Sequence, residues 1–363
     1  MNPKSTEIHY NIHNKVLVRI STCTQDLIDE CTFFFRYFLS EEKTAPQEYI
    51  ISDYAVFQFP PLNSRVNKYI IGFDHGFCLP KERYAVEITD NRITEYTVGI
   101  TNSTLLWLQV LLTRQNMSLL HGAGVEINGK GIVLTGLSGS GKTSLITQLR
   151  TRAGFRFFTD EHLLLDKEGV MYSNPVDLTI LEEHLALIPD LQISSFHSYF
   201  KKRNRIIRIL QRADKFPLPR MLQRQKTYVL SELTRFWAGR DYVKLPATDL
   251  ISPEKIGTHT RIGVAFLLSR SHVQDITIKP VDLTIFIDKN IGMLNLQFKD
   301  YYFYMHILSS LGIFNCAEFE RKQKEILSDC FSKIRLYEVT IPETVSPADL
   351  AGSILSVIDT LEK

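Results

Sequence analysis

The stretch that most constrains the fold is the glycine-rich octapeptide GLSGSGKT at residues 136–143. It matches the pattern GxxxxGK[ST] at every fixed position and stands between an apolar run, GIVLT, and a helical pattern, SLITQLR. Glycines let successive backbone N–H groups turn toward a phosphate, and the helix that follows presents its N-terminus to the same anion. The order of strand, loop, lysine and helix predicts a phosphate-binding loop; a chance glycine-rich turn is the alternative.

The loop predicts a site for the phosphates of ATP and for Mg²⁺. Lys142 is expected to reach the β- and γ-phosphates, and the Thr143 hydroxyl is expected to ligate the metal ion. The residues expected to bind the nucleotide are Gly136, Ser138, Gly139, Ser140, Gly141, Lys142, Thr143 and Ser144. The same loop serves motors, switches, transporters and kinases, so the function class depends on the residues around it.

A tight turn is predicted immediately before the loop. The sequence VEI-NG-KGIVLT places Asn128-Gly129 between two apolar runs, the strongest short-range signal of a two-residue β-hairpin. The strand at 122–127 should therefore run antiparallel to the loop's own strand at 131–135. In doubly wound nucleotide-binding folds the strands beside the loop are parallel and joined by helical crossovers, so this chain is expected to differ from them.

Two adjacent acids, Asp160 and Glu161, follow the loop closely. They end the strand-like run FRFFT, and eighteen residues separate Lys142 from Asp160, about one helix and one strand. Such a pair can hold Mg²⁺ and accept a proton from an attacking hydroxyl, both of which phosphoryl transfer needs. A motor ATPase could also use an acid pair at a strand end, but its acid normally comes later in the chain. A solvated acidic turn is the structural alternative.

The segments HGAGVEINGKGIVLTGLSGSGKTSL and FRFFTDE together resemble the catalytic core of the HPr serine kinase/phosphorylase superfamily. That family has a histidine-glycine on the strand before the loop, a hairpin into the loop and an acidic pair shortly after it. Its fold is related to that of phosphoenolpyruvate carboxykinase. The match covers about residues 119–180, with NPVDLTI as its weaker end. The resemblance implies an α/β fold, a P-loop kinase core with a mixed sheet, that uses ATP and Mg²⁺.

The resemblance also implies roles for individual residues. Lys142 and Thr143 keep their nucleotide and metal roles. His121 falls on the family histidine near the catalytic acid, and Asp160 falls on the acid that deprotonates the acceptor serine. Glu161 stands where the family usually has a second aspartate, which suits Mg²⁺ but leaves the division of labour between the two acids open. Without the resemblance, His121 would be interpreted as an ordinary strand residue.

The implied activity is transfer of the γ-phosphate of ATP to a serine hydroxyl of a peptide or protein. Some relatives phosphorylate a serine of a precursor peptide in modified-peptide pathways of the lasso type. The characteristic later loops of the bifunctional enzyme are not found in this chain, so reverse phosphorylase activity is not expected. A small-molecule hydroxyl kinase, and a nucleotide-binding regulator or ATPase without a phosphate acceptor, are the alternatives. Members of the family often assemble as homo-oligomers.

The first hundred residues predict a smaller α+β domain. Short apolar runs alternate with turn residues and indicate strands, but apolar residues at spacings of one, three and four predict a helix over 26–39. Its aromatic stripe is expected to pack in the core. A second helix, over 102–116, joins this part to the loop-bearing part. The predicted domains are therefore an N-terminal domain, 1–101, and a P-loop catalytic domain, 102–363.

A basic segment stands apart from the rest of the chain. Residues 201–226 hold ten lysines and arginines and one acid, Asp214, whereas the remainder holds 32 basic and 39 acidic residues. The isoleucines of the segment predict an amphipathic surface helix, with docking of an acidic peptide or protein substrate as the functional alternative. Few aromatic residues are present to stack on bases, so no nucleic acid partner is expected. Phe216–Pro219 is expected to form a connector.

The composition favours a soluble cytoplasmic protein. Hydrophobic residues make up 44% of the chain and the net charge is +2. No run of about twenty apolar residues exists to span a bilayer, so no membrane partner is expected. The N-terminal residues lack the apolar core of a secretory signal, and the five widely spaced cysteines include no CxxC pair. These features predict a reducing compartment and no zinc site.

Overall fold

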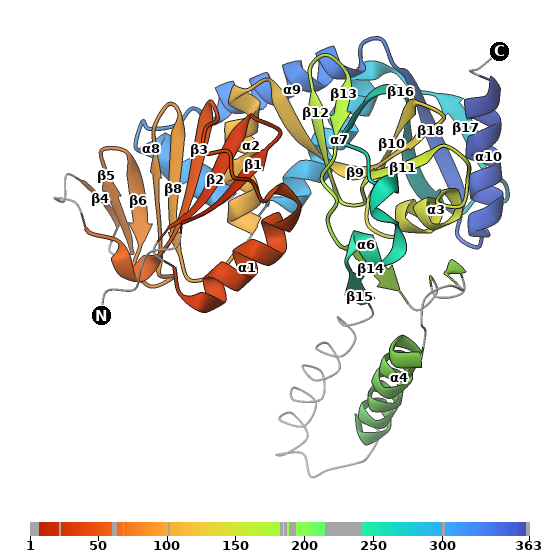
Figure 1. The fold of residues 1–363 in the computed structure, drawn as a ribbon, viewed down its shortest axis with the longest axis horizontal. Coiled ribbons are helices and arrows are strands. Elements are labelled where there is room, and N and C mark those ends of the chain that lie inside the picture. The colour runs from red at the N-terminus through yellow and green to blue at the C-terminus, as the bar shows by residue number, and fades with distance from the viewer. Residues whose placement is uncertain are drawn as a thin grey trace.

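The computed structural model of the chain contains two large mixed β-sheets with helices packed on them (Figure 1). It describes residues 7–360 apart from residues 22, 60–63, 68, 101, 182–183, 185–186, 189–193, 215–241, 300 and 301. One sheet is built from the first hundred residues and the other from strands after residue 116. The mixed α/β fold class predicted from the sequence is confirmed.

The N-terminal sheet has the strand order β1-β2-β3-β8-β7-β6-β5-β4. Its strands are β1 (Ile8–Ile12), β2 (Val16–Ser21), β3 (Gln47–Asp53), β4 (Ser64–Asn67), β5 (Ile70–Phe73), β6 (Gly76–Leu79), β7 (Tyr84–Ile88) and β8 (Arg92–Thr97). The pairs β2–β3 and β3–β8 are parallel, and the other neighbouring pairs are antiparallel. Helix α1 (Gln25–Phe35) and the 3₁₀ turn η1 (Arg36–Phe38) connect β2 to β3, and η2 (Tyr54–Val56) follows β3.

Helix α1 and η1 together confirm the helix predicted over 26–39. Leu27, Cys31 and Phe35, four residues apart, are buried in the core under the N-terminal sheet. Three further residues of the predicted stripe pack against that core while staying partly exposed: Ile28, Phe34 and Phe38. The aromatic stripe is therefore core packing, as the spacing predicts.

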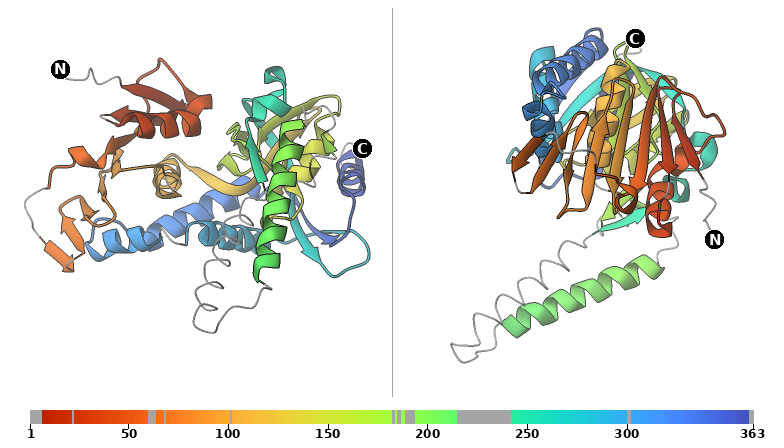
Figure 2. Two further views of the ribbon diagram at one scale, coloured as in Figure 1. Left: turned by 90° about the horizontal axis from the view of Figure 1, so that it is seen from below. Right: turned by 90° about the vertical axis from the view of Figure 1, so that its left-hand side faces the viewer.

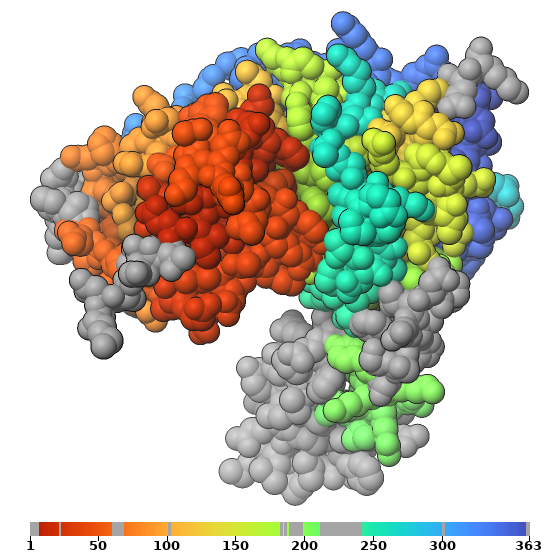
Figure 3. All heavy atoms as spheres, viewed as in Figure 1, coloured from red at the N-terminus to blue at the C-terminus, as the bar shows by residue number. Residues whose placement is uncertain are grey.

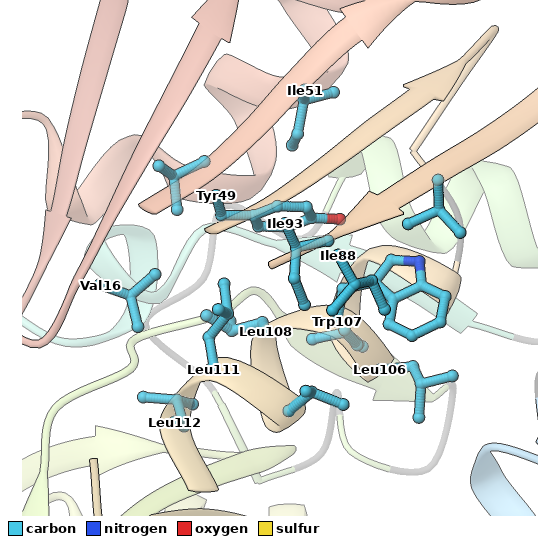
Figure 4. Close-up of a cluster of buried hydrophobic side chains, with 14 of the residues drawn as sticks. Val16, Tyr49, Ile51, Ile88, Ile93, Leu106, Trp107, Leu108, Leu111 and Leu112 are labelled. Atoms are coloured by element: carbon cyan, nitrogen blue, oxygen red, sulfur yellow. The ribbon is translucent and has the colours of Figure 1, made fainter. Parts of the chain in front are cut away.

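Helix α2 (Asn102–Arg114) packs on the N-terminal sheet and supplies much of its core (Figure 4). The side chains that it buries there include Leu106, Trp107, Leu108, Leu111 and Leu112. Trp107 Nε1 donates to the hydroxyl of Tyr84 at 2.6 Å. The buried carboxylate of Glu95 accepts from the Ser103 hydroxyl at 2.6 Å and from the Thr104 hydroxyl at 3.1 Å. These bonds satisfy polar groups that would otherwise be buried without partners.

A helix from the other end of the chain completes this core. Helix α8 (Tyr302–Ser310) packs on the N-terminal sheet, and the ring of Tyr304 stacks on that of Tyr84 with centroids 4.8 Å apart. Met305 and Leu308 are fully buried in the same cluster as Trp107. The core of the N-terminal sheet thus includes residues from both sides of the predicted domain boundary at 101, which stays a prediction.

The second sheet surrounds the glycine-rich loop. Its strand order is β10-β9-β12-β13-β16-β18-β17, with β11 paired to β9 and with β10 paired also to β16. Its strands are β9 (Met117–Ile127), β10 (Lys130–Thr135), β11 (Phe155–Thr159), β12 (His162–Asp166), β13 (Val170–Tyr172), β16 (His259–Ser271), β17 (Thr277–Pro280) and β18 (Arg335–Pro342). The pairings close β10, β9, β12, β13 and β16 into a ring, because the long strands β9 and β16 each pair at both of their ends.

Strands β9 and β10 form the predicted hairpin. They pair antiparallel from Ile127 opposite Lys130 to Gly122 opposite Thr135. Asn128 and Gly129 have φ values of 51° and 80°, the left-handed conformations of a type I′ turn. On its other edge β10 runs parallel to β16. The strand that leads into the loop therefore lies between one antiparallel and one parallel neighbour.

Helices cover the second sheet in two groups. Helix α3 (Lys142–Leu149), which begins inside the loop motif, packs with α10 (Pro347–Thr360). Helices α7 (Leu283–Gln297) and α9 (Cys316–Phe331) pack together over a separate hydrophobic cluster. Two short elements, α6 (Ala247–Leu250) and η4 (Pro253–Lys255), precede β16. The loop end of β10 is thereby fixed by packing on both faces of the sheet.

Helix α4 (Ser194–Asp214) stands out from the body of the molecule (Figures 1, 2 and 3). In the sequence it comes between β14 (Leu178–Leu181) and β15 (Tyr242–Leu245), which pair as a two-stranded antiparallel sheet. Its basic residues Lys201, Lys202, Arg205 and Arg208 are exposed, whereas Ile206, Ile207 and Leu210 are half-buried. This agrees with an amphipathic surface helix, although Ile209 is exposed. Residues 215–226, including Phe216–Pro219, lie outside the described residues. Within the described parts of the chain, no helix is both long and apolar enough to cross a membrane.

Candidate active site

A cavity of about 610 Å³ lies over the glycine-rich loop and the first turn of α3. The predicted site residues that line it are His121, Ser138, Gly139, Gly141, Lys142, Thr143, Ser144, Asp160 and Glu161. Gly136 and Ser140 do not line this cavity. The carbonyl of Gly136 accepts a bond from Lys142, and Ser140 lines a neighbouring hollow. The fold therefore brings nearly all of the predicted residues to one place.

The glycines of the loop adopt backbone conformations that other residues rarely adopt. Gly139 and Gly141 have φ values of 80° and 100°, a left-handed region that residues with a Cβ rarely adopt. A Cβ at Gly136 would lie 2.5 Å from the carbonyl oxygen of Leu268, so only glycine fits there. The ammonium of Lys142 donates to the carbonyls of Gly136 at 2.6 Å and Leu137 at 3.1 Å. Burial lowers the pKa of Lys142 from its ordinary value.

Asp160 lies directly against the first turn of α3. The Thr143 hydroxyl donates to Asp160 Oδ2 at 2.8 Å. The carboxyl is 7% exposed, and its other oxygen, Oδ1, has no hydrogen-bond partner among the described residues. Burial raises the pKa of Asp160 to about 7. A carboxylate with a pKa near neutrality and one unpartnered oxygen is suited to accept a proton at physiological pH.

Glu161 differs from its neighbour in electrostatic environment. Burial alone would raise the pKa of Glu161, but electrostatic interactions with His162, Lys244, His121 and Lys142 lower it below its ordinary value. At a pH of about 7, Glu161 is therefore ionised, whereas Asp160 is about half protonated. The pKa values of the two acids are shifted in opposite directions, so the two carboxyls differ in charge near neutral pH.

His121 occupies the last position at which β9 pairs with β12. It stands opposite His162, with ring centroids 6.4 Å apart, and the His162 Nε2 accepts from the Gln297 amide at 2.5 Å. Burial lowers the pKa of His121 to about 4, and the charge of Lys142 acts in the same direction. The Nδ1 of His121 is buried and has no partner among the described residues. His121 is thus a neutral imidazole with an unused polar atom, unlike an ordinary strand histidine.

Sequence reasoning missed several residues of the cavity. They are Asp177, Thr179, Leu181, His184, Tyr242, Lys244 and Arg270. Arg270, at the end of β16, donates from Nε to the carbonyl of Gly139 at 2.8 Å and from Nη1 to the carbonyl of Glu343 at 2.7 Å. Together with Lys142 and Lys244 it gives the cavity three basic side chains, which suits a polyanionic ligand.

A second hollow of about 510 Å³ adjoins the first. Ser138, Gly139 and Arg270 line both. Its apolar walls come from the exposed loop residue Leu137 and from Met293 and Leu296 of α7. A ligand on the glycine-rich loop could therefore extend an apolar part into this space without leaving the protein surface.

The residues around Thr143 fit a magnesium ion bound together with a nucleotide. Within the described residues, no group of three or more histidine, cysteine or acidic side chains is arranged to hold a metal ion by itself. Mg²⁺ typically takes only one or two protein carboxylates and completes its shell with phosphates and water. The hydroxyl of Thr143 and the ionised carboxylate of Glu161 are hard oxygen donors of that kind.

Known proteins offer a structural similarity but no family assignment. No protein-family model and no curated protein matches the chain. Among solved structures, the HPr(Ser) kinase/phosphatase from Coxiella burnetii is similar over 68% of this chain and 99% of its own, with 8% sequence identity and a TM-score of 0.29. This similarity is too low to carry an argument about activity. Function is therefore inferred from the side chains of the cavity.

Proposed function

We propose that the protein is a cytoplasmic ATP-dependent kinase that transfers the γ-phosphate to a serine hydroxyl of a peptide or protein. The observation that carries the proposal is the position of Asp160, a buried carboxyl with a pKa of about 7, bonded to Thr143 at the start of the loop helix. A base with that pKa, placed where the phosphates bind, suits transfer to an alcohol.

In the proposed reaction, the acceptor's hydroxyl proton passes to Asp160 Oδ1. The serine oxygen forms a bond to the γ-phosphorus, and the bond from that phosphorus to the β–γ bridging oxygen breaks, so that the products are phosphoserine and ADP. Lys142 and Arg270 neutralise negative charge on the phosphates. Mg²⁺, when bound with ATP through Thr143 and Glu161, would supply further charge neutralisation. The neutral His121 lines the same cavity, and its proposed role is to donate or accept a hydrogen bond beside the reacting groups.

The acceptor is proposed to be a peptide or protein because of the shape and charge around the cavity. Residues of β14 and β15 line the cavity, and α4, which comes between these two strands in the sequence, carries exposed basic residues. An acidic peptide would be attracted to that helix. A precursor peptide of a lasso-type pathway is one acceptor of this class.

Acceptor dependence of ATP turnover tests the proposal. The protein is mixed with Mg²⁺ and ATP and with a panel of serine peptides of acidic, neutral and basic character, each paired with its Ser→Ala form. A kinase should turn over ATP quickly only with a serine peptide and should favour acidic ones. Equal turnover with and without every acceptor, including small-molecule alcohols, would favour an ATPase or regulator instead.

A further inference from the structure

Asp177 is a cavity residue that the proposed reaction does not use. It lies between β13 and β14, is 9% exposed, and lines the cavity together with Lys142 and Thr143. Its Oδ1 accepts from the guanidinium of Arg36, whereas its Oδ2 is buried and has no partner among the described residues. A carboxylate therefore forms part of the wall of a cavity whose proposed ligand is itself strongly negative.

The partner of Asp177 comes from the N-terminal sheet. Arg36 is the first residue of η1 and lies 141 positions from Asp177 in the sequence. Its guanidinium is 4.7 Å from the ring centre of Phe33 and 4.9 Å from that of Tyr37. Only a quarter of its side chain is exposed, so the charge is held in place by rings of its own segment.

A second contact fixes the same wall of the cavity. His13 Nε2, in the turn between β1 and β2, donates to the carbonyl of Ser173 at 2.6 Å. The His13 ring also packs on Tyr172 and Phe38, with centroids 5.2 and 5.5 Å apart. The N-terminal sheet thus contacts the segment 172–177 at both of its ends.

We propose that Arg36, in the segment that connects β2 to β3, sets the nucleotide affinity of the loop by neutralising Asp177. The inference rests on nucleotide binding by the loop, which is part of the proposed function. An ionised carboxylate left without its cation in a buried wall repels phosphates and is costly in itself. Arg36 is the positioning residue that removes this repulsion.

The test is a double-mutant cycle on MgATP affinity, measured by titration with a fluorescent ATP analogue. Arg36→Met keeps an apolar stem between the two rings but removes the charge, and should weaken MgATP binding about tenfold, a typical coupling between two sites. Asp177→Asn should bind at least as tightly as the unaltered protein. The double variant should bind within about threefold of Asp177→Asn, because no charge is left to neutralise.

Controls separate this electrostatic role from a structural one. Arg19→Met removes another ion pair of the N-terminal sheet, with Glu48, and should leave MgATP affinity unchanged. Arg36→Met with unaltered affinity, or a double variant as weak as Arg36→Met, would overturn the inference. If Arg36→Met does not fold, Asp177→Asn decides alone, since a tenfold loss of affinity would contradict it. Failure of the unaltered protein to bind MgATP would instead refute the proposed function.

Discussion

Replacing Asp160 by asparagine isolates the proposed proton transfer. Asparagine has nearly the same shape and can still accept the bond from the Thr143 hydroxyl, which is 2.8 Å long. It cannot take a proton. Removal of a general base costs on the order of 10²- to 10⁴-fold in rate, or about 3–5 kcal/mol of activation free energy. MgATP affinity should change by less than about threefold, because the phosphate contacts from the loop and Lys142 remain.

The pH dependence provides a second signature of the same base. With a pKa of about 7, Asp160 is protonated and inactive in acid. The transfer rate of the unaltered protein should rise tenfold per pH unit below that value and level off above it. The residual rate of Asp160→Asn should lack this rise.

The assay is single-turnover transfer of labelled phosphate to the best serine peptide, measured at several pH values. Asp166→Asn is the matched control, since Asp166 is also a buried aspartate at a strand end but accepts from Tyr172 and does not line the cavity. Transfer by Asp160→Asn within about fivefold of the unaltered protein would refute the assignment of Asp160 as the base.

Three further predictions follow from the same geometry. Lys142→Ala should weaken MgATP binding roughly 10- to 100-fold, as expected for lost bonds from a charged group, while the melting temperature stays within a few degrees; equal affinity in a titration would exclude a phosphate role. Glu161→Gln should raise the Mg²⁺ concentration needed for half-maximal transfer more than it lowers the rate at saturating Mg²⁺; the reverse pattern would exchange the roles of the two acids. In the absence of nucleotide, Asp160→Asn should raise the free energy of unfolding by up to about 4 kcal/mol at pH 8 but not at pH 4. Burial raises the pKa of Asp160 from 3.8 to about 7, so ionisation of this carboxyl lowers the free energy of unfolding of the unaltered protein as the pH rises through this window. An equal effect of Asp160→Asn on the unfolding curves at both pH values would contradict this prediction.

The parts of the site that could be predicted from the sequence are those whose residues lie close together in the chain. The Asn128-Gly129 turn, the loop and the acid pair lie within 33 residues of each other, and Asn128, Gly129 and the loop glycines can adopt the positive φ values that the turn and the loop require. The resemblance added His121 to this set. Its unpartnered Nδ1 and its pKa, which is lowered mainly by burial and also by Lys142, depend on the folded structure and not on local sequence.

The residues that sequence reasoning missed reach the cavity through long-range pairing. Arg270 contacts Gly139 across 131 positions because β16 runs parallel to β10. Lys244 enters because β15 pairs with β14, and Asp177 is held by Arg36 from the other sheet. No local spacing encodes these contacts. A basic residue at the end of a buried strand, as in VAFLLSR, was the one available signal for Arg270.

The destination of the γ-phosphate tests the central claim most directly. ATP labelled at the γ-position is incubated with the protein, Mg²⁺ and the acceptor peptide, and the products are separated and identified by mass spectrometry. A kinase with Asp160 as base should place the label on the peptide's serine, in an amount that matches ADP formed, and Asp160→Asn should form this product at least about 100-fold more slowly. Label found only as inorganic phosphate, at the same rate with the serine peptide and with its alanine form, would contradict the account.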